Sequence, residues 1–395
     1  MVNKVLFIGN YPNNINKNLY VFFRNLVHAI ADLGIECHVI SPVSLTKYKT
    51  SIKLIPRDKE EKTDKGRTVY VHHPRYISFS QMKIGPINTM EYTHRSYLYA
   101  VLKETKKLNV NFDAAYGHFF FSGGLAAAHI GKVFSIPSFI AYGESSYEVM
   151  VRGKKVPITQ DSISALSGII SVSSKNTNEL RNEAVYNNVP IFTCPNAIDL
   201  NLFPERNKIE CREHFGIPKD DFVVGFVGGF SERKGDKRVL EACKDLDGIS
   251  LAFAGHGDPP IGENVVFCNS VEHNDIGKFL SCLDVFVLPT LNEGCCNAIL
   301  EAMAAGCAIV SSNLPFNDDI IDETNSIKIN PKSIEEIRNA IIRLKDDNNF
   351  RLKISQKAKA DAQNFTIEKR AGKILGFMNE CKKNFTHKRE DTIGK

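Results

Sequence analysis

The sequence predicts an α/β protein with two doubly wound domains that face a central cleft. Strand-like apolar runs alternate with amphipathic helical segments along nearly the whole chain, and this pattern is typical of parallel sheets covered by helices. The 395 residues are also too many for one core, since domains usually have roughly 100–200 residues. Ligands of such sheets bind outside the carboxyl ends of the strands, so we expect the functional site in the cleft.

The first half opens with a strand, a loop and a helix. Residues 5–8 are a short apolar run, and apolar residues recur at helical spacing from Leu19 to Leu33 before Gly34 ends the helix. Residues 36–40 form the next strand, which completes a βαβ unit and implies a parallel sheet. Further elements of this half are expected at residues 113–116, 123–130, 138–141 and 168–173.

A second alternation of strands and helices follows a turn-rich segment at residues 193–204, which is expected to connect the two domains. Its expected strands are residues 222–227, 250–254, 264–267, 285–288 and 308–311. Its expected helices are residues 235–246, 273–282, 297–305, a segment from the capping box at Ser333 to Lys345, and 366–383. The polar tail after Asn384 is expected to fray. The predicted domains are therefore 1–195 and 205–364, with a final helix, 365–384, that crosses back to the first domain.

Composition excludes several function classes. No stretch approaches the roughly 20 apolar residues of a membrane span, and the chain begins without a signal-peptide layout, so we expect a cytoplasmic protein. Its ten cysteines are then reduced thiols, and no zinc-like spacing surrounds the Cys295–Cys296 pair, so no metal site is predicted. Nucleic-acid binding is not expected either, because no aromatic-interleaved basic stripe is present.

The basic residues gather in one stretch. Residues 46–68 contain eight Lys and Arg residues against four Asp and Glu residues, within a chain whose formal net charge is +5. Such a run is most often a solvated charged loop. The alternative is a patch that makes peripheral contact with the anionic head groups of a membrane.

The most informative segment is residues 284–306. A buried strand leads to a loop with Glu293 and Gly294, and the loop opens a helix that carries Glu301. Unpaired N–H groups and the helix dipole make the start of that helix a seat for phosphate. The two carboxylates lie at most about 12 Å apart along a helix, and each can accept two hydroxyl hydrogen bonds. One carboxylate can thus bind a sugar and the other a ribose, with a diphosphate between them.

This segment resembles the E-x7-E signature of the retaining GT-B glycosyltransferases of family 4. Glu293-x7-Glu301 matches the signature, and the similarity extends over nearly the whole chain. Residues 195–203 resemble the family's interdomain motif, Val227-Gly228 with Lys234-Gly235 resembles its G-R-L-x-x-x-K-G motif, and residues 255–258 resemble its G-x-G-x turn. The resemblance implies the GT-B architecture, with two Rossmann-like domains.

The resemblance also implies roles for individual residues. Glu301 would bind the ribose hydroxyls, Glu293 the donor sugar and Lys234 the diphosphate. A cation at Lys234 suits the charge that builds on a departing nucleoside diphosphate. His118 occupies the place of a family histidine that faces the donor from the first domain. The other donor-binding residues implied are Gly228, Gly229, Arg233, Gly294, Cys295, Cys296 and Asn297.

Three departures from the family pattern concern the diphosphate and the acceptor. The family's diphosphate-binding arginine falls on Gly229, so that its role is vacant or passes to Arg233. Residues 10–18 replace the usual Gly-rich loop, and Tyr142-Gly143-Glu144 replaces a frequent His-Gly pair. Glu144 and Asn14 are therefore candidate contacts to the acceptor or the donor sugar.

The predicted reaction moves a sugar from a nucleoside-diphosphate sugar, with UDP favoured, to a hydroxyl of a glycan or lipid-linked acceptor with retention of configuration. Cell-surface polysaccharide assembly is the expected setting. No cofactor or metal is required, because Lys234 and helix-terminal N–H groups neutralise the diphosphate. The first loop lacks the G-x-G-x-x-G of nicotinamide enzymes, and neither an epimerase acid nor a phosphorylase lysine can be located. The remaining alternative is a non-catalytic subunit that binds nucleotide sugar.

Overall fold

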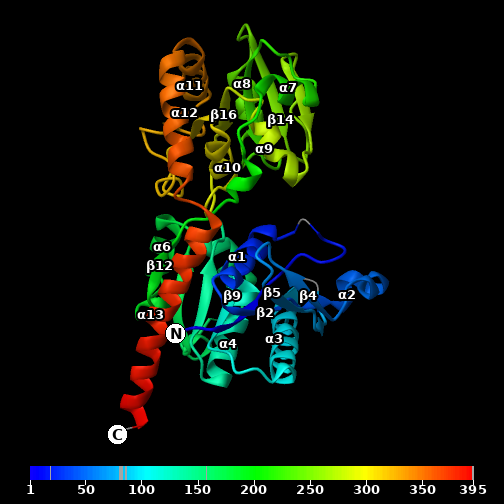
Figure 1. The fold of residues 1–395 in the computed structure, drawn as a ribbon, viewed down its shortest axis with the longest axis vertical. Helices are drawn as coiled ribbons and strands as arrows, with labels where there is room; N and C mark the ends of the chain where they lie inside the picture. The colour runs from blue at the N-terminus through cyan, green and yellow to red at the C-terminus, as the bar shows by residue number, and fades with distance from the viewer. Residues whose placement is uncertain (18, 80–82, 85–86, 157, 394–395) are drawn as a thin grey trace. The chain divides into compact units, whose positions relative to one another are not determined.

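The computed structural model of the chain describes residues 1–17, 19–79, 83–84, 87–156 and 158–393. The chain forms two compact units. Unit 1 contains Met1–Cys194 and Ile367–Lys395, and unit 2 contains Pro195–Thr366. Each unit is built on one large sheet, and Figure 1 shows helices packed against both sheets. The expected α/β fold with two sheets is confirmed.

The sheet of unit 1 has eight strands in the order β12-β11-β10-β9-β1-β2-β5-β4. Every neighbouring pair is parallel except β4 and β5. The bounds in chain order are β1 Lys4–Ile8, β2 Glu36–Ile40, β4 Asp58–Lys62, β5 Thr68–His72, β9 Ala114–His118, β10 Ser138–Tyr142, β11 Leu166–Ser171 and β12 Ile191–Thr193.

Alternate residues of the central strand β1 face two different layers of helices. Val5 and Phe7 belong to a core that includes residues of α1 (Val21–Asp32) and α13 (Ile367–Ile393). Leu6 and Ile8 belong to a core with residues of α3 (Thr89–Leu108) and α4 (Leu125–Phe134). This alternation is the period of two that a strand buried on both faces requires.

Shorter elements complete unit 1 around this sheet. They are β3 Val43–Ser44, α2 Leu45–Tyr48, η1 Lys49–Leu54, β6 Arg75–Tyr76, β7 Lys83–Ile84, β8 Ile87–Asn88, η2 Phe119–Gly124, α5 Tyr147–Met150, η3 Arg152–Lys154, η4 Asp161–Ile163, α6 Ser174–Arg181 and η5 Ala184–Tyr186. Strand β3 pairs with β6 and β7 pairs with β8.

Unit 2 has an all-parallel sheet of six strands in the order β15-β14-β13-β16-β17-β18. The strands are β13 Phe222–Val227, β14 Ile249–Ala254, β15 Val265–Asn269, β16 Val285–Leu288, β17 Ala308–Ser312 and β18 Ser326–Ile329. Its helices are η6 Leu200–Leu202, α7 Lys208–Phe215, α8 Asp236–Ala242, η7 His273–Asp275, α9 Ile276–Leu280, α10 Asn297–Ala305, α11 Ile334–Asp346 and α12 Asn348–Ala362. The strand order reverses between β13 and β16, which is where ligands of such sheets bind.

The expected charged loop at residues 46–68 is wrong in its second part. Residues 58–62 form the edge strand β4, which pairs antiparallel with β5. All five residues of β4 are charged, so the strand shows no apolar alternation. Ion pairs and hydrogen bonds fix this strand in place of apolar packing. Its inward-facing Glu61 accepts hydrogen bonds from the side chains of Tyr11, Arg24, His28 and Lys59. This network holds the pKa of Glu61 well below its usual range although burial opposes the charge.

Other expected boundaries also change. The expected helix at 235–246 ends at Ala242, and the one at 273–282 begins as a 3-10 turn and ends at Leu280. The tail after Asn384 does not fray in the structure, because α13 continues to Ile393 through a run without Gly or Pro. Within the described residues, no helix is both long enough and apolar enough to cross a membrane.

Candidate functional site

Two neighbouring loops of unit 2 form the first group of candidate residues. One loop joins β13 to α8 and the other joins β16 to α10, so both leave the carboxyl ends of paired strands. The backbone N–H of Leu291 donates to the carbonyl of Arg233 at 2.8 Å. The side chain of Arg238 also donates to the carbonyl of Pro289 at 2.9 Å. These bonds fix the two loops against each other.

Glu293 is the centre of this group. Its Oε1 accepts from Lys234 Nζ at 2.8 Å, from Thr290 Oγ1 at 3.0 Å and from the guanidinium of Arg233. The side chains of Glu293 and Lys234 are only 14% and 15% exposed, whereas Arg233 is 48% exposed. The predicted Lys234 and Glu293 therefore meet as a largely buried ion pair, and Arg233 closes it from the solvent side.

The charges around Lys234 keep it protonated. Burial opposes its charge, but interactions with Cys296, were it ionised, and with Glu293 raise the pKa of Lys234, and near pH 7 the charge comes from Glu293. Burial raises the pKa of Cys296 to about 11, so this thiol is neutral near pH 7. Burial also raises the pKa of Glu301 to about 7, against the opposing effect of Lys234. Glu301 is thus poised between its neutral and ionised forms.

The first turn of α10 supplies backbone donors beside these side chains. Cys296 is its N-cap, and its side chain makes no capping hydrogen bond. The first N–H groups of the helix have no partner within the helix, so the helix end favours an anion. Cys295 Sγ accepts from the N–H of Asn196, and Asn297 Oδ1 accepts from the amide of Asn196 at 2.8 Å. Both contacts hold the loop from Gly294 to Asn297 in place.

The glycines of the other loop allow a close approach of two backbones. A Cβ at Gly255 would lie 1.9 Å from the carbonyl oxygen of Gly228, whose φ is +152°. A Cβ at Gly229 would meet nothing closer than His256 at 3.7 Å, so the place of the family's arginine is open space. The guanidinium of Arg233 does not occupy it, because it binds Glu293 and the carbonyl of Asn292.

Asp236 is a polar residue of this loop that the sequence reasoning missed. It is the first residue of α8 and is 1% exposed. Its Oδ1 accepts from the N–H of Ser231 at 2.7 Å, whereas its Oδ2 has no hydrogen-bond partner among the described residues. Burial raises the pKa of Asp236. The signal for it was an acidic residue directly after Lys234-Gly235 at a helix start.

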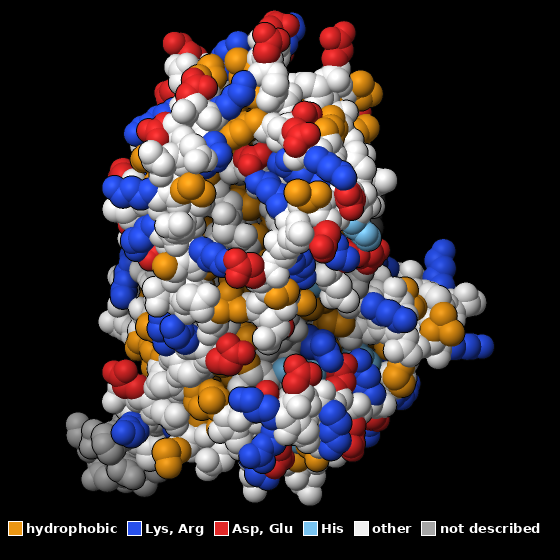
Figure 2. Space-filling model, turned by 45° about the horizontal axis from the view of Figure 1, so that its top comes forward, with side chains coloured by type: hydrophobic (Ala, Val, Ile, Leu, Met, Phe, Trp, Pro, Cys, Tyr) orange, Lys and Arg blue, Asp and Glu red, His pale blue; other side chains and the backbone are white. Residues whose placement is uncertain are grey.

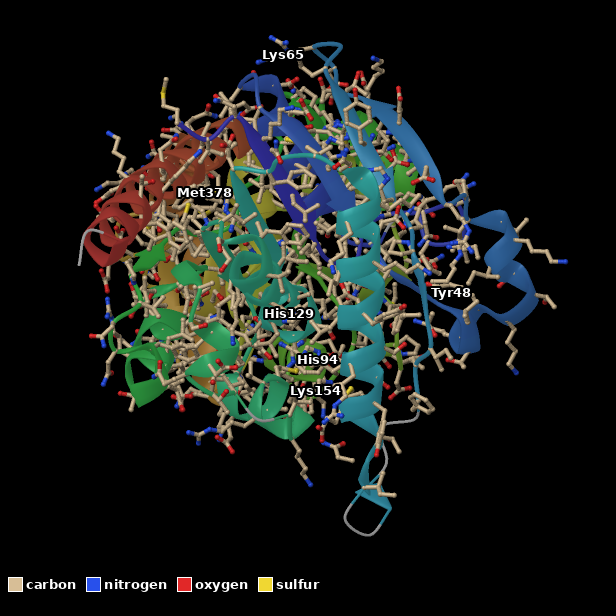
Figure 3. All side chains as sticks on the ribbon, turned by 90° about the horizontal axis from the view of Figure 1, so that it is seen from below. Tyr48, Lys65, His94, His129, Lys154 and Met378 are labelled. Atoms are coloured by element: carbon tan, nitrogen blue, oxygen red, sulfur yellow. The ribbon has the colours of Figure 1, made fainter. Side chains whose placement is uncertain are left out.

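Unit 1 contains the second group of candidate residues, around a cavity of about 700 Å³. The cavity lies beyond the carboxyl ends of β1, β9 and β10, and is lined by residues that follow these strands. His118 and Glu144 both line it. Lys154 is another lining residue, and Figure 3 shows it beside the first turns of α3, near His94.

His118 is buried in this wall without polar partners. Its ring stacks on Phe23 at a centroid distance of 4.3 Å, and it is 8% exposed. Neither ring nitrogen has a hydrogen-bond partner among the described residues. Burial, with a smaller effect of Arg370, lowers the pKa of His118 to about 3. His118 is therefore neutral and has one N–H donor and one acceptor to offer.

Glu144 is held by backbone donors. Its Oε1 accepts from the N–H of Phe120 at 2.6 Å and its Oε2 accepts from the N–H of Gly143 at 3.1 Å. Burial raises the pKa of Glu144 to about 7 despite these bonds. Asn14 does not lie with it, since Asn14 donates to the carbonyl of Leu54 at 2.9 Å and does not line the cavity. The expected loop at 10–18 includes Asn18, which lies outside the described residues.

Most of the cavity wall was not predicted. It is largely aromatic, and the apolar spacing of these residues in the sequence resembles that of any core. The aromatic lining residues are Tyr20, Phe22, Tyr76, Phe79, Tyr97, Phe119 and Phe121. Such a wall packs against the apolar faces of a ligand, while the few polar groups fix its orientation.

One cluster could hold a metal ion among the described residues. Ligand atoms of Asp58, His72 and Glu104 all lie within 4.8 Å of one another. Lys107 Nζ, however, lies 2.8 Å from Glu104 and 3.7 Å from Asp58. The ammonium group already supplies the positive charge that these carboxylates attract, and none of the three residues lines the cavity of unit 1.

Comparisons with known proteins point to one family. Residues 207–361 match the family model of the glycosyl transferases group 1. TuaC of Bacillus subtilis, named for teichuronic acid biosynthesis, is 24% identical over 86% of this chain and 88% of its own. An Escherichia coli UDP-Gal:alpha-D-GlcNAc-diphosphoundecaprenol alpha-1,3-galactosyltransferase is 29% identical, over 47% of this chain and 52% of its own.

The solved structures agree on the fold. Sucrose-phosphate synthase from Thermosynechococcus elongatus superposes with a TM-score of 0.75 over 96% of this chain and 98% of its own, at 17% identity. This similarity confirms the predicted GT-B fold of two α/β sheets. Residues 207–361 are thus similar to the glycosyl transferases group 1, and the chain as a whole has the GT-B fold.

Proposed function

We propose that the protein transfers a sugar from a UDP-sugar to a hydroxyl of a glycan or lipid-linked acceptor, with retention of configuration. We further propose that it acts in the cytoplasm, in cell-surface polysaccharide biosynthesis. The observation that carries this proposal is the largely buried Lys234–Glu293 ion pair beside the first turn of α10. The Escherichia coli relative, whose name gives UDP-Gal and a diphosphoundecaprenol acceptor, supports the choice of donor and acceptor class.

In this proposal each group of the donor has a partner in unit 2. Glu301 binds the ribose hydroxyls, and the diphosphate lies at the start of α10 beside Lys234. Glu293 and the backbone N–H groups from Gly294 to Asn297 bind the donor sugar. A fixed ammonium group and fixed N–H groups stabilise the leaving diphosphate without reorganisation, which is the main electrostatic contribution to such a transfer.

The proposed chemistry needs no protein nucleophile. Retaining glycosidases place two carboxyl groups about 5 Å apart across the scissile bond. We assign no such pair here. Glu293 forms ion pairs with Arg233 and Lys234, and Glu301 is assigned to the ribose hydroxyls. The acceptor hydroxyl then attacks on the face that the diphosphate leaves, its proton passes to the leaving phosphate oxygen, and the glycosidic bond forms as the sugar–phosphate bond breaks.

We assign the acceptor to the cavity of unit 1. Neutral His118 and the carboxyl group of Glu144 are buried polar groups of this cavity, and its aromatic wall suits sugar faces or an apolar tail. His118 can donate one hydrogen bond and accept another, which matches the two roles of a sugar hydroxyl. We also propose that His118 contacts the donor sugar, as the resemblance to the family implies.

The nucleotide preference is tested by thermal unfolding in the presence of UDP, GDP, ADP and their common sugar conjugates. A ligand that binds only the folded protein raises the melting temperature by mass action. We expect a shift with uridine nucleotides that is lost in Glu301→Ala. A shift with another base instead, or one that survives in Glu301→Ala, contradicts the assignment.

The pKa of Glu301 predicts that donor affinity depends on pH. If the ionised form accepts the ribose hydroxyls, the competent fraction rises as the pH passes about 7. The affinity for UDP-glucose should therefore increase about tenfold between pH 6 and pH 8, since apparent affinity scales with that fraction. Calorimetry measures it, with Glu301→Gln as the variant that loses the slope. The control is His256→Gln. His256 lies beside Gly229 in the same unit but has no assigned contact with the ribose, so this variant should keep the slope.

One observation favours a second candidate, a non-catalytic subunit that binds nucleotide sugar. The place of the family's arginine is empty at Gly229, and Arg233 is bound to Glu293 instead. Hydrolysis of the UDP-sugar or transfer to added acceptor distinguishes the two candidates. Binding of UDP-sugar with neither reaction, in the presence of membrane-extracted acceptor lipids, supports the subunit.

A further inference from the structure

The residues from 45 to 57, which we name the basic knob, carry unpaired positive charge. The knob contains α2 and η1 and projects from the sheet of unit 1, as Figure 1 shows at the label of α2. Its charged residues before Asp58 are Lys47, Lys49, Lys53 and Arg57. All four are exposed, and none forms an ion pair with a residue that the structure describes. The knob is thus a cationic surface without internal neutralisation.

Large apolar side chains are exposed in the same segment as these charges. Leu45 is 43% exposed and Leu54 is 64% exposed. In Figure 2 hydrophobic side chains lie among Lys and Arg side chains on the projection at the right. Surface leucines are unremarkable one at a time, but here they share a short projecting segment with four cations. This combination is typical of surfaces that lie in the head-group region of an anionic bilayer.

The apolar surface continues next to the knob. Ser44 and Thr46 bond to Ser78 at 2.5 and 2.8 Å, and the segment around Ser78 exposes Ile77 by 45% and Phe79 by 48%. Hydrogen bonds thus attach this segment to the start of the knob. The exposed apolar surface extends from the knob to the residues on both sides of Ser78.

The remainder of the basic stretch lacks these features. Residues 58–68 mix basic with acidic residues, and Glu61 and Asp58 are paired. No large hydrophobic side chain is exposed among the described residues of this hairpin. Figure 3 shows Lys65 on the hairpin and Tyr48 on the knob as separate projections. The structure therefore divides the stretch into a neutralised hairpin and an unneutralised amphipathic knob.

We propose that the basic knob docks on a bilayer of anionic phospholipid. Lys47, Lys49 and Lys53 contact the lipid phosphates, while Leu45 and Leu54 enter the boundary between head groups and acyl chains. A bilayer explains both features together, since an acidic protein segment would satisfy the charges but would leave the separated leucines without a common apolar partner. Contact is peripheral, in agreement with the lack of a spanning helix in the described part of the chain.

Docking at this place also defines how an acceptor reaches the cavity. Tyr76, Ser78 and Phe79 line the cavity, and Phe79 is half exposed beside the knob. The cavity wall therefore reaches the surface where the bilayer would lie. This consequence rests on the proposed function: a lipid-linked acceptor presents its sugar from the bilayer directly to His118 and Glu144, without leaving the membrane.

The test is co-sedimentation of the full chain with vesicles of phosphatidylcholine alone or with 30% phosphatidylglycerol. We expect binding to the anionic vesicles that weakens as salt is raised. Replacing Lys47, Lys49 and Lys53 together by Gln should weaken binding on the order of 100-fold, since each basic residue near the surface contributes about fivefold. The matched control replaces Lys62, Lys65 and Arg67 by Gln on the hairpin and should bind as the wild type does.

A second pair of variants tests the apolar part. Leu45→Ser with Leu54→Ser should weaken vesicle binding, whereas Leu33→Ser should not, at a leucine that is 48% exposed at the C-cap of α1. The proposal is overturned if the protein binds neutral and anionic vesicles equally, or if the hairpin variant loses as much binding as the knob variant. It is also overturned if the leucine variant loses self-association of the protein but keeps vesicle binding. Vesicle binding needs no donor, and nucleotide stabilisation needs no vesicle. Failure of one therefore leaves the other interpretable.

Discussion

Glu293→Gln is expected to lower transfer by about 10²–10³-fold, the usual effect of removing one preorganised electrostatic contact. The carboxylate is 14% exposed and holds Lys234 at 2.8 Å, so the amide removes the charge that positions the ammonium group. It also removes the acceptor for the hydroxyls of the donor sugar. The affinity for UDP should fall much less than the rate, because Glu301 and the start of α10 are unaltered and Lys234 keeps its charge. Initial rates with radiolabelled UDP-sugar and calorimetry with UDP measure the two effects.

Glu241→Gln is the matched control for this substitution. Glu241 lies on α8 in the same unit, is exposed and forms no ion pair with a described residue. Its substitution should leave both the rate and the affinity unchanged. A Glu293→Gln protein with the wild-type rate refutes the placement of the donor sugar, whereas loss of UDP binding together with the rate moves Glu293 to the nucleotide.

Asp284→Ala is expected to destabilise the fold by about 3–5 kcal/mol without altering the chemistry. The carboxylate accepts from Arg212 at 2.8 Å, from Lys208 at 2.5 Å and from the N–H of Val223 at 2.8 Å. Arg212 is 4% exposed, so its guanidinium would remain buried without its counter-ion. The melting temperature followed by circular dichroism should fall by roughly 10 °C. Asp284 precedes β16, at the end of the strand opposite Glu293, so the protein that is still folded should keep its rate.

The control for this effect is an exposed ion pair of the same unit. Asp258 and Lys237 are 80% and 62% exposed, and Asp258→Ala should change stability by less than about 1 kcal/mol. Replacing Arg212 by Met together with Asp284 by Leu removes both buried charges and should recover part of the loss. If the double variant is no more stable than Asp284→Ala, the loss comes from packing and not from the unpaired charge.

The sequence predicted the bounds of secondary-structure elements best where an apolar strand is followed directly by a turn. The bounds of β13, β16 and α10 follow from an apolar run and a closing Gly306, and the meeting of Lys234 with Glu293 follows from neighbouring strands. Each of these features depends on local pattern or on the parallel order of strands. The roles of Glu293, Lys234 and Glu301 toward a donor came from the resemblance and stay predictions.

Other features depend on contacts distant in sequence. Strand β4 is stabilised by Glu61 with residues of α1, which no local pattern displays. The long helix α3 was missed because its residues are mostly polar with a low mean hydropathy, and only one side of it packs on the sheet. The pKa of Glu144 depends on backbone donors at Phe120 and Gly143, which lie together only after folding.

The last helix of the chain has a consequence for the order of synthesis. Unit 1 is discontinuous, because α13 packs on its sheet and Lys382 bonds to Asp113 at 2.5 Å, while Asn379 accepts from the N–H of Val2. Unit 2 is continuous, and in the sequence it comes between the two segments of unit 1. On the ribosome the unit made second can therefore complete its core first, whereas residues 1–194 must wait for the final helix to cover their apolar face. A nascent chain arrested before α13 holds one finished unit and one with that face still open.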